Sequence, residues 1–151
     1  MKNKFQQIFI LIFLLYSCSQ IDREFTNKFS SYLKINFHQE LKNDCLYIVI
    51  PVLACEGCIE TIINRIKSKN CISNKIIIIA VAETNAELNY ITLELNEFSI
   101  LKDRQNKYLK EMEYEGFYPY MIEVKNKQVV FHKEMNISSN IEKSLKLIDG
   151  Y

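Results

Sequence analysis

Apolar residues recur along this chain with different periods, and each period predicts a different element. From Ile21 to about Leu41 they return every three or four positions, which predicts an amphipathic helix. The short apolar runs 46–52 and 75–82 are rich in β-branched residues, so each predicts a strand buried in a sheet. Between them, from Cys58 to about Lys69, isoleucines return every three or four positions and predict a second helix.

The middle of the chain has weaker patterns. Residues 83–89 are mostly polar and predict a loop, whereas residues 90–95 alternate between apolar and polar positions and predict a short strand. Residues 100–114 have apolar positions at helical spacing. They predict a helix that ends before Gly116, because glycine is unfavourable inside a helix.

Two alternating runs, 120–124 and 128–131, follow Pro119 and flank the polar residues 125–127. This pattern predicts a β-hairpin. A serine at 138–139 can then cap a last helix. The buried side of that helix is expected to carry Ile141, Leu145 and Ile148.

The order strand, helix, strand predicts a right-handed parallel unit, and the hairpin adds antiparallel strands at one edge. The predicted fold class is therefore α/β, with a central mixed sheet. At 151 residues, 48% hydrophobic and 25% charged, the chain has the composition of one folded domain. Its net charge of +1, without a basic block, gives no support for nucleic acid as a partner.

The N-terminus has the features of a targeting segment. Lys2 and Lys4 give a basic start, residues 8–16 form an apolar core too short to span a membrane, and Ser17 precedes Cys18. The pattern resembles a bacterial lipoprotein signal. This resemblance implies lipidation at Cys18 and an extracytoplasmic place in the bacterial cell envelope, anchored in a membrane. An ordinary secretory signal and an uncleaved anchor are the alternatives.

We therefore expect a lipoprotein signal peptide over residues 1–17, a tether and N-terminal helix over 18–45, and the folded domain over 46–151. Disulfides persist outside the cytoplasm. Of the remaining cysteines, only Cys55 and Cys58 have a spacing that by itself argues for pairing.

The segment Cys55-Glu56-Gly57-Cys58 lies where a predicted strand ends and a predicted helix begins. Two thiols at this spacing can close a small disulfide ring or bind a soft metal ion. The unpaired N–H groups and positive dipole end of the helix stabilise a thiolate at the first cysteine, whereas the charge of Glu56 opposes it. The motif therefore indicates redox or soft-metal chemistry.

The cysteine pair at the start of the first core helix, the proline before the hairpin and the closing helix together resemble the thioredoxin fold, a three-layer sandwich with flanking helices. The resemblance implies that Cys55 attacks a partner disulfide, that Cys58 resolves the mixed disulfide, and that Pro119 lies against the pair in the cis form. The long segment before Pro119 is similar to extracytoplasmic, membrane-tethered thiol–disulfide oxidoreductases. The implied partners are protein thiols or disulfides, with no dissociable cofactor.

The chain departs from that family in two respects. Ala54 stands where the family usually has an aromatic residue, and Glu56-Gly57 replace the usual residues between the cysteines. The strand over 46–50 also carries no acid that could accept a proton.

Other functions stay open from the sequence. A C-x-x-C at a helix start also resembles a heavy-metal-associated domain, although Leu53 stands where the usual Met would be and the hairpin and last helix have no place there. A structural disulfide in a binding lipoprotein is a second alternative. A zinc site from Cys45, Cys55, Cys58 and Cys71 is a third, but only one close pair is present.

The remaining candidate residues have plainer interpretations. Cys45 and Cys71 are each expected to be small buried hydrophobes. His132 is expected on the surface. Three tyrosines around Pro119 are candidates for a peptide-docking face: Tyr114, Tyr118 and Tyr120.

Overall fold

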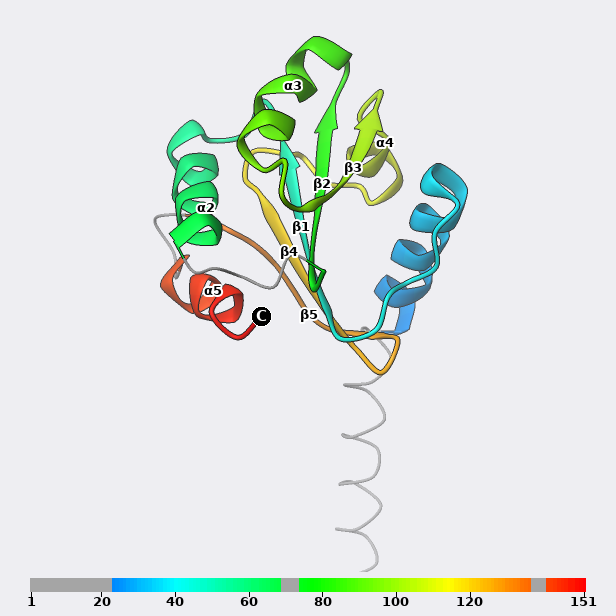
Figure 1. Cartoon of the computed structure of the whole chain (residues 1–151). Coiled ribbons are helices and arrows are strands. Elements are labelled where there is room, and N and C mark those ends of the chain that lie inside the picture. Colours follow the sequence, from blue (N-terminus) through cyan, green and yellow to red (C-terminus); the bar gives the residue numbers. More distant parts are fainter. Residues whose placement is uncertain (1–22, 69–73, 137–140) are drawn as a thin grey trace, which may run out of the picture.

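The computed structural model describes residues 23–68, 74–136 and 141–151 (Figure 1). A helix over residues 23–37 comes first. The later elements are β1 (Cys45–Pro51), α2 (Glu56–Ser68), β2 (Ile76–Ala82), α3 (Asn85–Glu94), β3 (Ser99–Arg104), α4 (Lys107–Glu111), β4 (Tyr120–Lys125), β5 (Gln128–Glu134) and α5 (Ile141–Ile148). Among these described helices, none has the length and apolar character needed to cross a membrane.

The five strands form one mixed sheet in the order β3-β2-β1-β4-β5. β1 lies in the middle, where it pairs in parallel with β2 and antiparallel with β4. β3 extends the parallel side, and β5 completes the antiparallel hairpin. All seven residues of β1 and of β2 are buried, as the two apolar runs predict.

Helices cover both faces of this sheet (Figure 1). α2, α3 and α5 pack on one face, and the helix over 23–37 packs with the short α4 on the other. The result is a three-layer α/β sandwich with a central mixed sheet. This confirms the thioredoxin-like fold class expected from the sequence.

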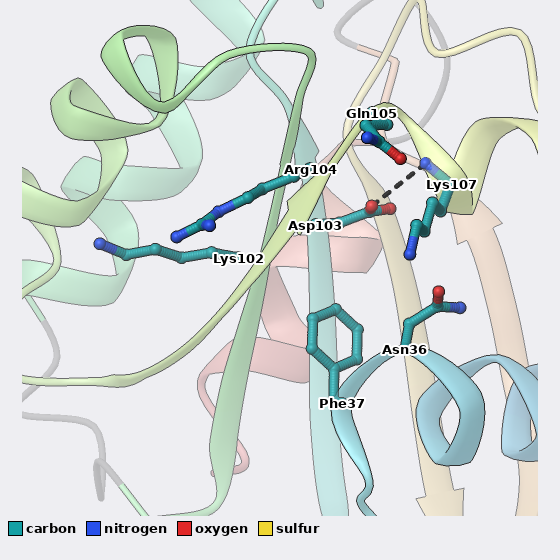
Figure 2. A pocket seen from close by; sticks show the side chains of 7 residues that line it. All are labelled: Asn36, Phe37, Lys102, Asp103, Arg104, Gln105 and Lys107. Atoms are coloured by element: carbon teal, nitrogen blue, oxygen red, sulfur yellow. Dashed lines mark hydrogen bonds between the residues drawn. The ribbon is translucent and has the colours of Figure 1, made fainter.

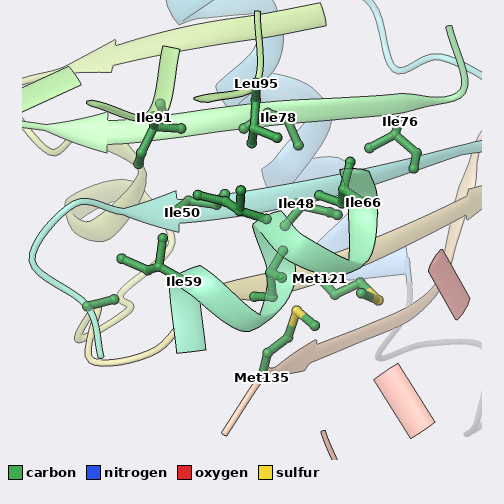
Figure 3. Packing of buried hydrophobic residues seen from close by; sticks show 14 of the residues in the cluster. Ile48, Ile50, Ile59, Ile66, Ile76, Ile78, Ile91, Leu95, Met121 and Met135 are labelled. Atoms are coloured by element: carbon green, nitrogen blue, oxygen red, sulfur yellow. The ribbon is translucent and has the colours of Figure 1, made fainter. Parts of the chain in front are cut away.

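The face beneath α2, α3 and α5 is aliphatic. Figure 3 shows isoleucines of β1, β2 and α2 meeting between the sheet and the helix. Ile62 and Ile66 of α2 and Ile48 of β1 are all 0% exposed. Burying one such side chain stabilises the fold by about 1.5–3 kcal/mol. The start of α2, and with it the cysteine motif, is therefore fixed firmly on the sheet.

The opposite face is built from aromatic side chains with polar tips. Phe29 and Tyr47 pack edge to face, with ring centroids 5.1 Å apart. The Tyr32 hydroxyl donates a hydrogen bond of 2.9 Å to the buried carboxylate of Asp103. These contacts join the helix over 23–37 to the sheet as one folded unit.

Residues 83–95 contain a helix, so the loop and strand predicted there are wrong. A capping box starts α3: the backbone N–H of Glu87 donates to the Thr84 hydroxyl, and the backbone N–H of Thr84 donates to the Glu87 carboxylate. The alternation over 90–95 is too short to outweigh this cap and the helical spacing of the buried residues. Those residues are Leu88, Ile91 and Leu95.

The single helix predicted over 100–114 is also wrong, because this segment holds β3 and then α4. Leu101 and Asp103 alternate toward the aromatic face, and the strand pairs in register with β2. Gln105 and Asn106 both have positive φ, at 71° and 53°, and turn the backbone between the two elements. Apolar positions at helical spacing thus belong partly to an edge strand.

The remaining predicted elements are confirmed: the N-terminal helix, α2, the hairpin β4–β5 and α5. Several predictions lie outside the described residues. They are the signal peptide over 1–17, the lipidated Cys18, Cys71 and the serine cap at 138–139.

Candidate functional site

The site begins where β1 ends. After Pro51 the chain turns, with the Ala54 N–H donating to the Pro51 carbonyl at 3.0 Å. The Cys55 carbonyl accepts the N–H groups of Cys58 and Ile59, both at 3.0 Å. Cys55 is therefore the N-cap residue of α2, the position whose side chain faces the first unpaired N–H groups of a helix.

The two cysteines of the motif differ in exposure. Cys55 is a half-buried free thiol, whereas Cys58, in the first turn of α2, is 0% exposed. Glu56 and Gly57 between them are exposed. An external reagent therefore reaches Cys55 before it reaches Cys58.

The loop before Pro119 contacts the motif through the backbone. The Cys55 N–H donates to the Phe117 carbonyl at 3.0 Å. Pro119 itself is buried, and its carbonyl accepts the Met135 N–H at 2.8 Å. The structure thus brings the cysteine motif and the Pro119 segment together, as the resemblance implies.

The expected cis bond is wrong, because every described peptide bond, including Tyr118–Pro119, is trans.

Local interactions hold this loop in shape. Gly116 has φ of +79°, a conformation that costs other residues strain, and an added Cβ would lie 3.0 Å from Leu109 Cδ1. The Tyr114 hydroxyl donates to the Tyr118 carbonyl at 2.6 Å, and the Tyr114 N–H donates to the Leu109 carbonyl at 2.9 Å. The backbone beside Cys55 is therefore anchored to α4.

The tyrosines predicted as a docking face mostly serve packing. Tyr114 and Tyr120 are half-buried in the aromatic face, with ring centroids 5.0 Å apart. Burial raises the pKa of Tyr120 to about 12. The exposed apolar side chains beside the motif are instead Phe117, 64% exposed, and Leu53, 83% exposed. Sequence reasoning missed both as contact residues, although exposed apolar residues flanking a motif are a usable signal.

His132, which was predicted on the surface, is half-buried. It lies within β5, where its ring stacks on Phe25 with centroids 3.9 Å apart. Its Nδ1 lies 2.6 Å from the Tyr120 hydroxyl. His132 therefore packs beneath the N-terminal helix as part of the aromatic face.

Cys45 lies at the opposite end of β1 from Cys55. The seven-residue strand between them spans roughly 20 Å at the usual rise of a strand, so the two thiols cannot share one metal ion. Cys45 is 4% exposed, as expected for a small buried hydrophobe, and burial raises the pKa of its thiol. This geometry rules out the four-thiolate zinc site that the sequence left open as a third alternative.

Within the described part of the chain, no group of three or more His, Cys, Asp or Glu residues could hold a metal ion. The hairpin β4–β5 and α5, which have no place in a heavy-metal-associated domain, are built into the sheet and the core. The structure therefore favours a thioredoxin-like fold over the fold of a heavy-metal-associated domain.

Sequence reasoning also missed the buried acid Asp103, which is 2% exposed. Its carboxylate accepts hydrogen bonds from the Tyr32 hydroxyl and from the backbone N–H groups of Lys107 and Tyr108. Burial raises the pKa of this carboxyl above the ordinary range. With three donors satisfied, Asp103 fixes the start of α4. The sequence pattern did not indicate this role, because it placed Asp103 inside the helix predicted over 100–114.

A cavity of about 340 Å³ lies beside Asp103 (Figure 2). Figure 2 shows that its basic side chains do not converge, because Lys102 and Arg104 point away from Lys107 and Asn36. This arrangement does not form an anion site.

No protein-family model matches the chain, and no curated protein matches it. Among solved structures, the chain is similar to a thioredoxin-like protein from Bacteroides caccae, with 20% sequence identity and a TM-score of 0.44. The match covers 70% of this chain and 41% of that protein, so the chain spans less than half the length of its structural neighbour.

Proposed function

We propose that this protein is a lipid-anchored thiol–disulfide oxidoreductase of the bacterial cell envelope, acting outside the cytoplasm through Cys55 and Cys58. The observation that supports the proposal best is the unequal exposure of two thiols at one helix start. Dithiol exchange needs this division, because the partner must reach the attacking thiol while the resolving thiol stays covered. The thioredoxin-like fold is consistent with such a redox role.

In the proposed reaction the Cys55 thiolate attacks one sulfur of a partner disulfide. The partner S–S bond breaks, a mixed disulfide with Cys55 forms, and the other partner sulfur leaves as a thiolate that takes up a proton. Cys58 then loses its proton to water and attacks the Cys55 sulfur, which releases the second partner thiol. Two electrons pass to the partner, and a Cys55–Cys58 disulfide remains. The reverse sequence oxidises a partner dithiol, and neither direction needs a dissociable cofactor.

The surroundings of Cys55 support this role. As the N-cap residue it faces the positive end of the α2 dipole, which stabilises a thiolate. Pro119 is proposed as a positioning residue. It is buried, and the carbonyl of Phe117, two residues earlier, accepts a hydrogen bond from the Cys55 N–H. The segment therefore keeps the Cys55 backbone in place while the sulfur reacts.

The test is the rate at which the reduced full-length protein, in a neutral detergent, reduces the disulfides of insulin. Replacing Cys55 by Ala should lower this rate at least about a hundredfold, because the attacking sulfur is gone. Cys58→Ala should accumulate mixed disulfides. Cys45→Ala is the matched control and should keep the wild-type rate. A Cys55→Ala protein as active as the wild type would end the proposal.

The anchor is tested separately by Cys18→Ala. Since Cys18 is the proposed lipid-bearing residue, this variant should remain unprocessed or leave the membrane fraction of the producing bacterium. Normal processing with unchanged membrane retention would contradict lipidation at Cys18 and leave the redox proposal standing.

A further inference from the structure

A groove of about 240 Å³ opens beside the cysteine motif, at the carboxyl ends of β1 and β2. Three loops enclose it: the turn after β1, the loop after β2 and the loop before Pro119. Its apolar lining includes Val52, Leu53, Leu109 and Phe117. The Phe117 carbonyl accepts a hydrogen bond from the Cys55 N–H, so a residue that lines the groove directly contacts the backbone of the N-cap cysteine.

The rim of the groove presents large apolar side chains to solvent. Leu53 is 83% exposed and Phe117 is 64% exposed. Isolated exposed residues of this kind are ordinary, but these two lie at one groove, one on each of two facing loops. They offer contact area to an apolar side chain of a docked segment.

The charge around the groove has one sign. The titratable residues that line it are Glu83, Glu87 and Glu115. Among the described residues that line the groove, none is a lysine or an arginine. The lining therefore has a local excess of negative charge in a chain whose net charge is only +1.

Two of these carboxylates are available to a partner. Glu83 and Glu115 are exposed, and neither belongs to an ion pair found among the described residues. Glu87, by contrast, accepts the Thr84 N–H in the capping box. Two lysines are adjacent in sequence to residues that line the groove. Lys107 lines the separate cavity beside Asn36 (Figure 2), and the Lys110 Nζ donates to the Gln105 carbonyl at 2.9 Å.

We propose that this groove binds a segment of the partner protein next to the reacting disulfide, and that the segment is both apolar and basic. This inference rests on the proposed function and specifies its substrate class. An apolar side chain enters the groove between Leu53 and Phe117, and flanking Lys or Arg side chains meet Glu83 and Glu115. Acidic segments and anionic lipid surfaces are repelled by the same carboxylates.

The first experiment measures binding without redox chemistry. Rhodamine-labelled pentapeptides Lys-Leu-Ser-Leu-Lys and Glu-Leu-Ser-Leu-Glu are titrated with the full-length protein in neutral detergent, followed by fluorescence anisotropy. At low salt the basic peptide should bind about tenfold more tightly than the acidic one. Near 1 M salt the difference should fall to about twofold, because rim charges are screened. Equal affinities at low salt would overturn the inference.

Two double variants locate the effect. Glu83→Gln with Glu115→Gln should remove most of the preference for the basic peptide. Glu40→Gln with Glu97→Gln removes the same charge from exposed positions just before β1 and β3, at the opposite end of the sheet, and should keep the preference. A preference that survives the first pair, or disappears equally in both, would also overturn the inference.

The last arm separates the groove from the redox function. The reduced protein is mixed with hydroxyethyl disulfide, a small neutral disulfide that needs no groove. Exchange with this compound combined with equal peptide affinities would contradict the groove and leave the proposed function intact. Selective peptide binding without any exchange would support the groove and contradict the oxidoreductase.

Discussion

At the carboxyl ends of the parallel strands, Cys55 is half-buried beside exposed loops rich in glutamate. At the amino end of β1, Cys45 is 4% exposed and closed in by hydrogen-bonded side chains. There the Tyr151 hydroxyl donates to the Glu123 carboxylate at 3.0 Å, and the Lys42 N–H donates to the Tyr47 hydroxyl at 3.0 Å. Each end of the strand thus carries a thiol, but only one end leaves it accessible.

The difference shows what the fold contributes to the chemistry. A cysteine within a central strand is covered on both faces, whereas one at a helix N-cap faces unpaired N–H groups and solvent. At the other edge the parallel strands β1 and β2 end together, and the loops that follow them line a groove with Phe117, whose carbonyl accepts the Cys55 N–H. Reactivity is therefore expected at one end of the sheet only.

The largest expected effect is in alkylation. In the folded, reduced protein, iodoacetamide should modify Cys55 at least about a hundredfold faster than Cys45, since Cys45 reacts only after local opening and burial raises the pKa of its thiol. Mass spectrometry of digested samples taken over time gives both rates. If Cys55 and Cys45 are alkylated at comparable rates both in the native protein and in denaturant, the two ends of β1 do not differ in thiol reactivity.

The next effect is on stability. Cys45→Ser places a hydroxyl in an apolar site and should lower the free energy of unfolding by about 1–3 kcal/mol. Cys55→Ser should leave it unchanged or raise it by up to about 1 kcal/mol, because serine is a favoured N-cap residue. Urea denaturation measures both. A larger loss at Cys55 than at Cys45 would contradict the N-cap assignment.

The smallest expected effect concerns the loop that holds Cys55. Gly116→Ala puts a side chain at positive φ and close to Leu109, so it should cost about 1–2 kcal/mol of stability and slow exchange at Cys55. Gly150→Ala is the control, because its added Cβ meets only the Leu147 carbonyl at 3.4 Å. Equal effects of the two substitutions would mean that the loop conformation does not depend on Gly116.

The sequence allowed the strands and the motif to be predicted because their signals are local. Two β-branched runs identified the central strands, and the cysteine spacing identified the candidate site. Tertiary context decided the region between them and Pro119. The capping box at Thr84 outweighed a short alternation, and pairing with β2 made a strand of residues with helical spacing.

The groove could not be predicted for a related reason. Leu53 and Phe117 are 64 positions apart in the chain and line one groove only because β1 and β4 are neighbours in the sheet. Likewise His132 looked like a surface residue because nothing near it in sequence indicates Phe25, which covers it. Contacts between distant segments carry this information.

The most direct test of the central claim is a redox titration of the full-length protein in glutathione buffers. The thiols are trapped by alkylation at each ratio, and the disulfide is mapped by mass spectrometry. The account predicts that Cys55 and Cys58 lose their thiols together as one two-electron couple. The midpoint should lie between about −270 and −120 mV, the range of dithiol oxidoreductases, while Cys45 stays reduced. Persistence of both thiols in oxidising buffer, or pairing of Cys55 with a cysteine other than Cys58, would contradict it.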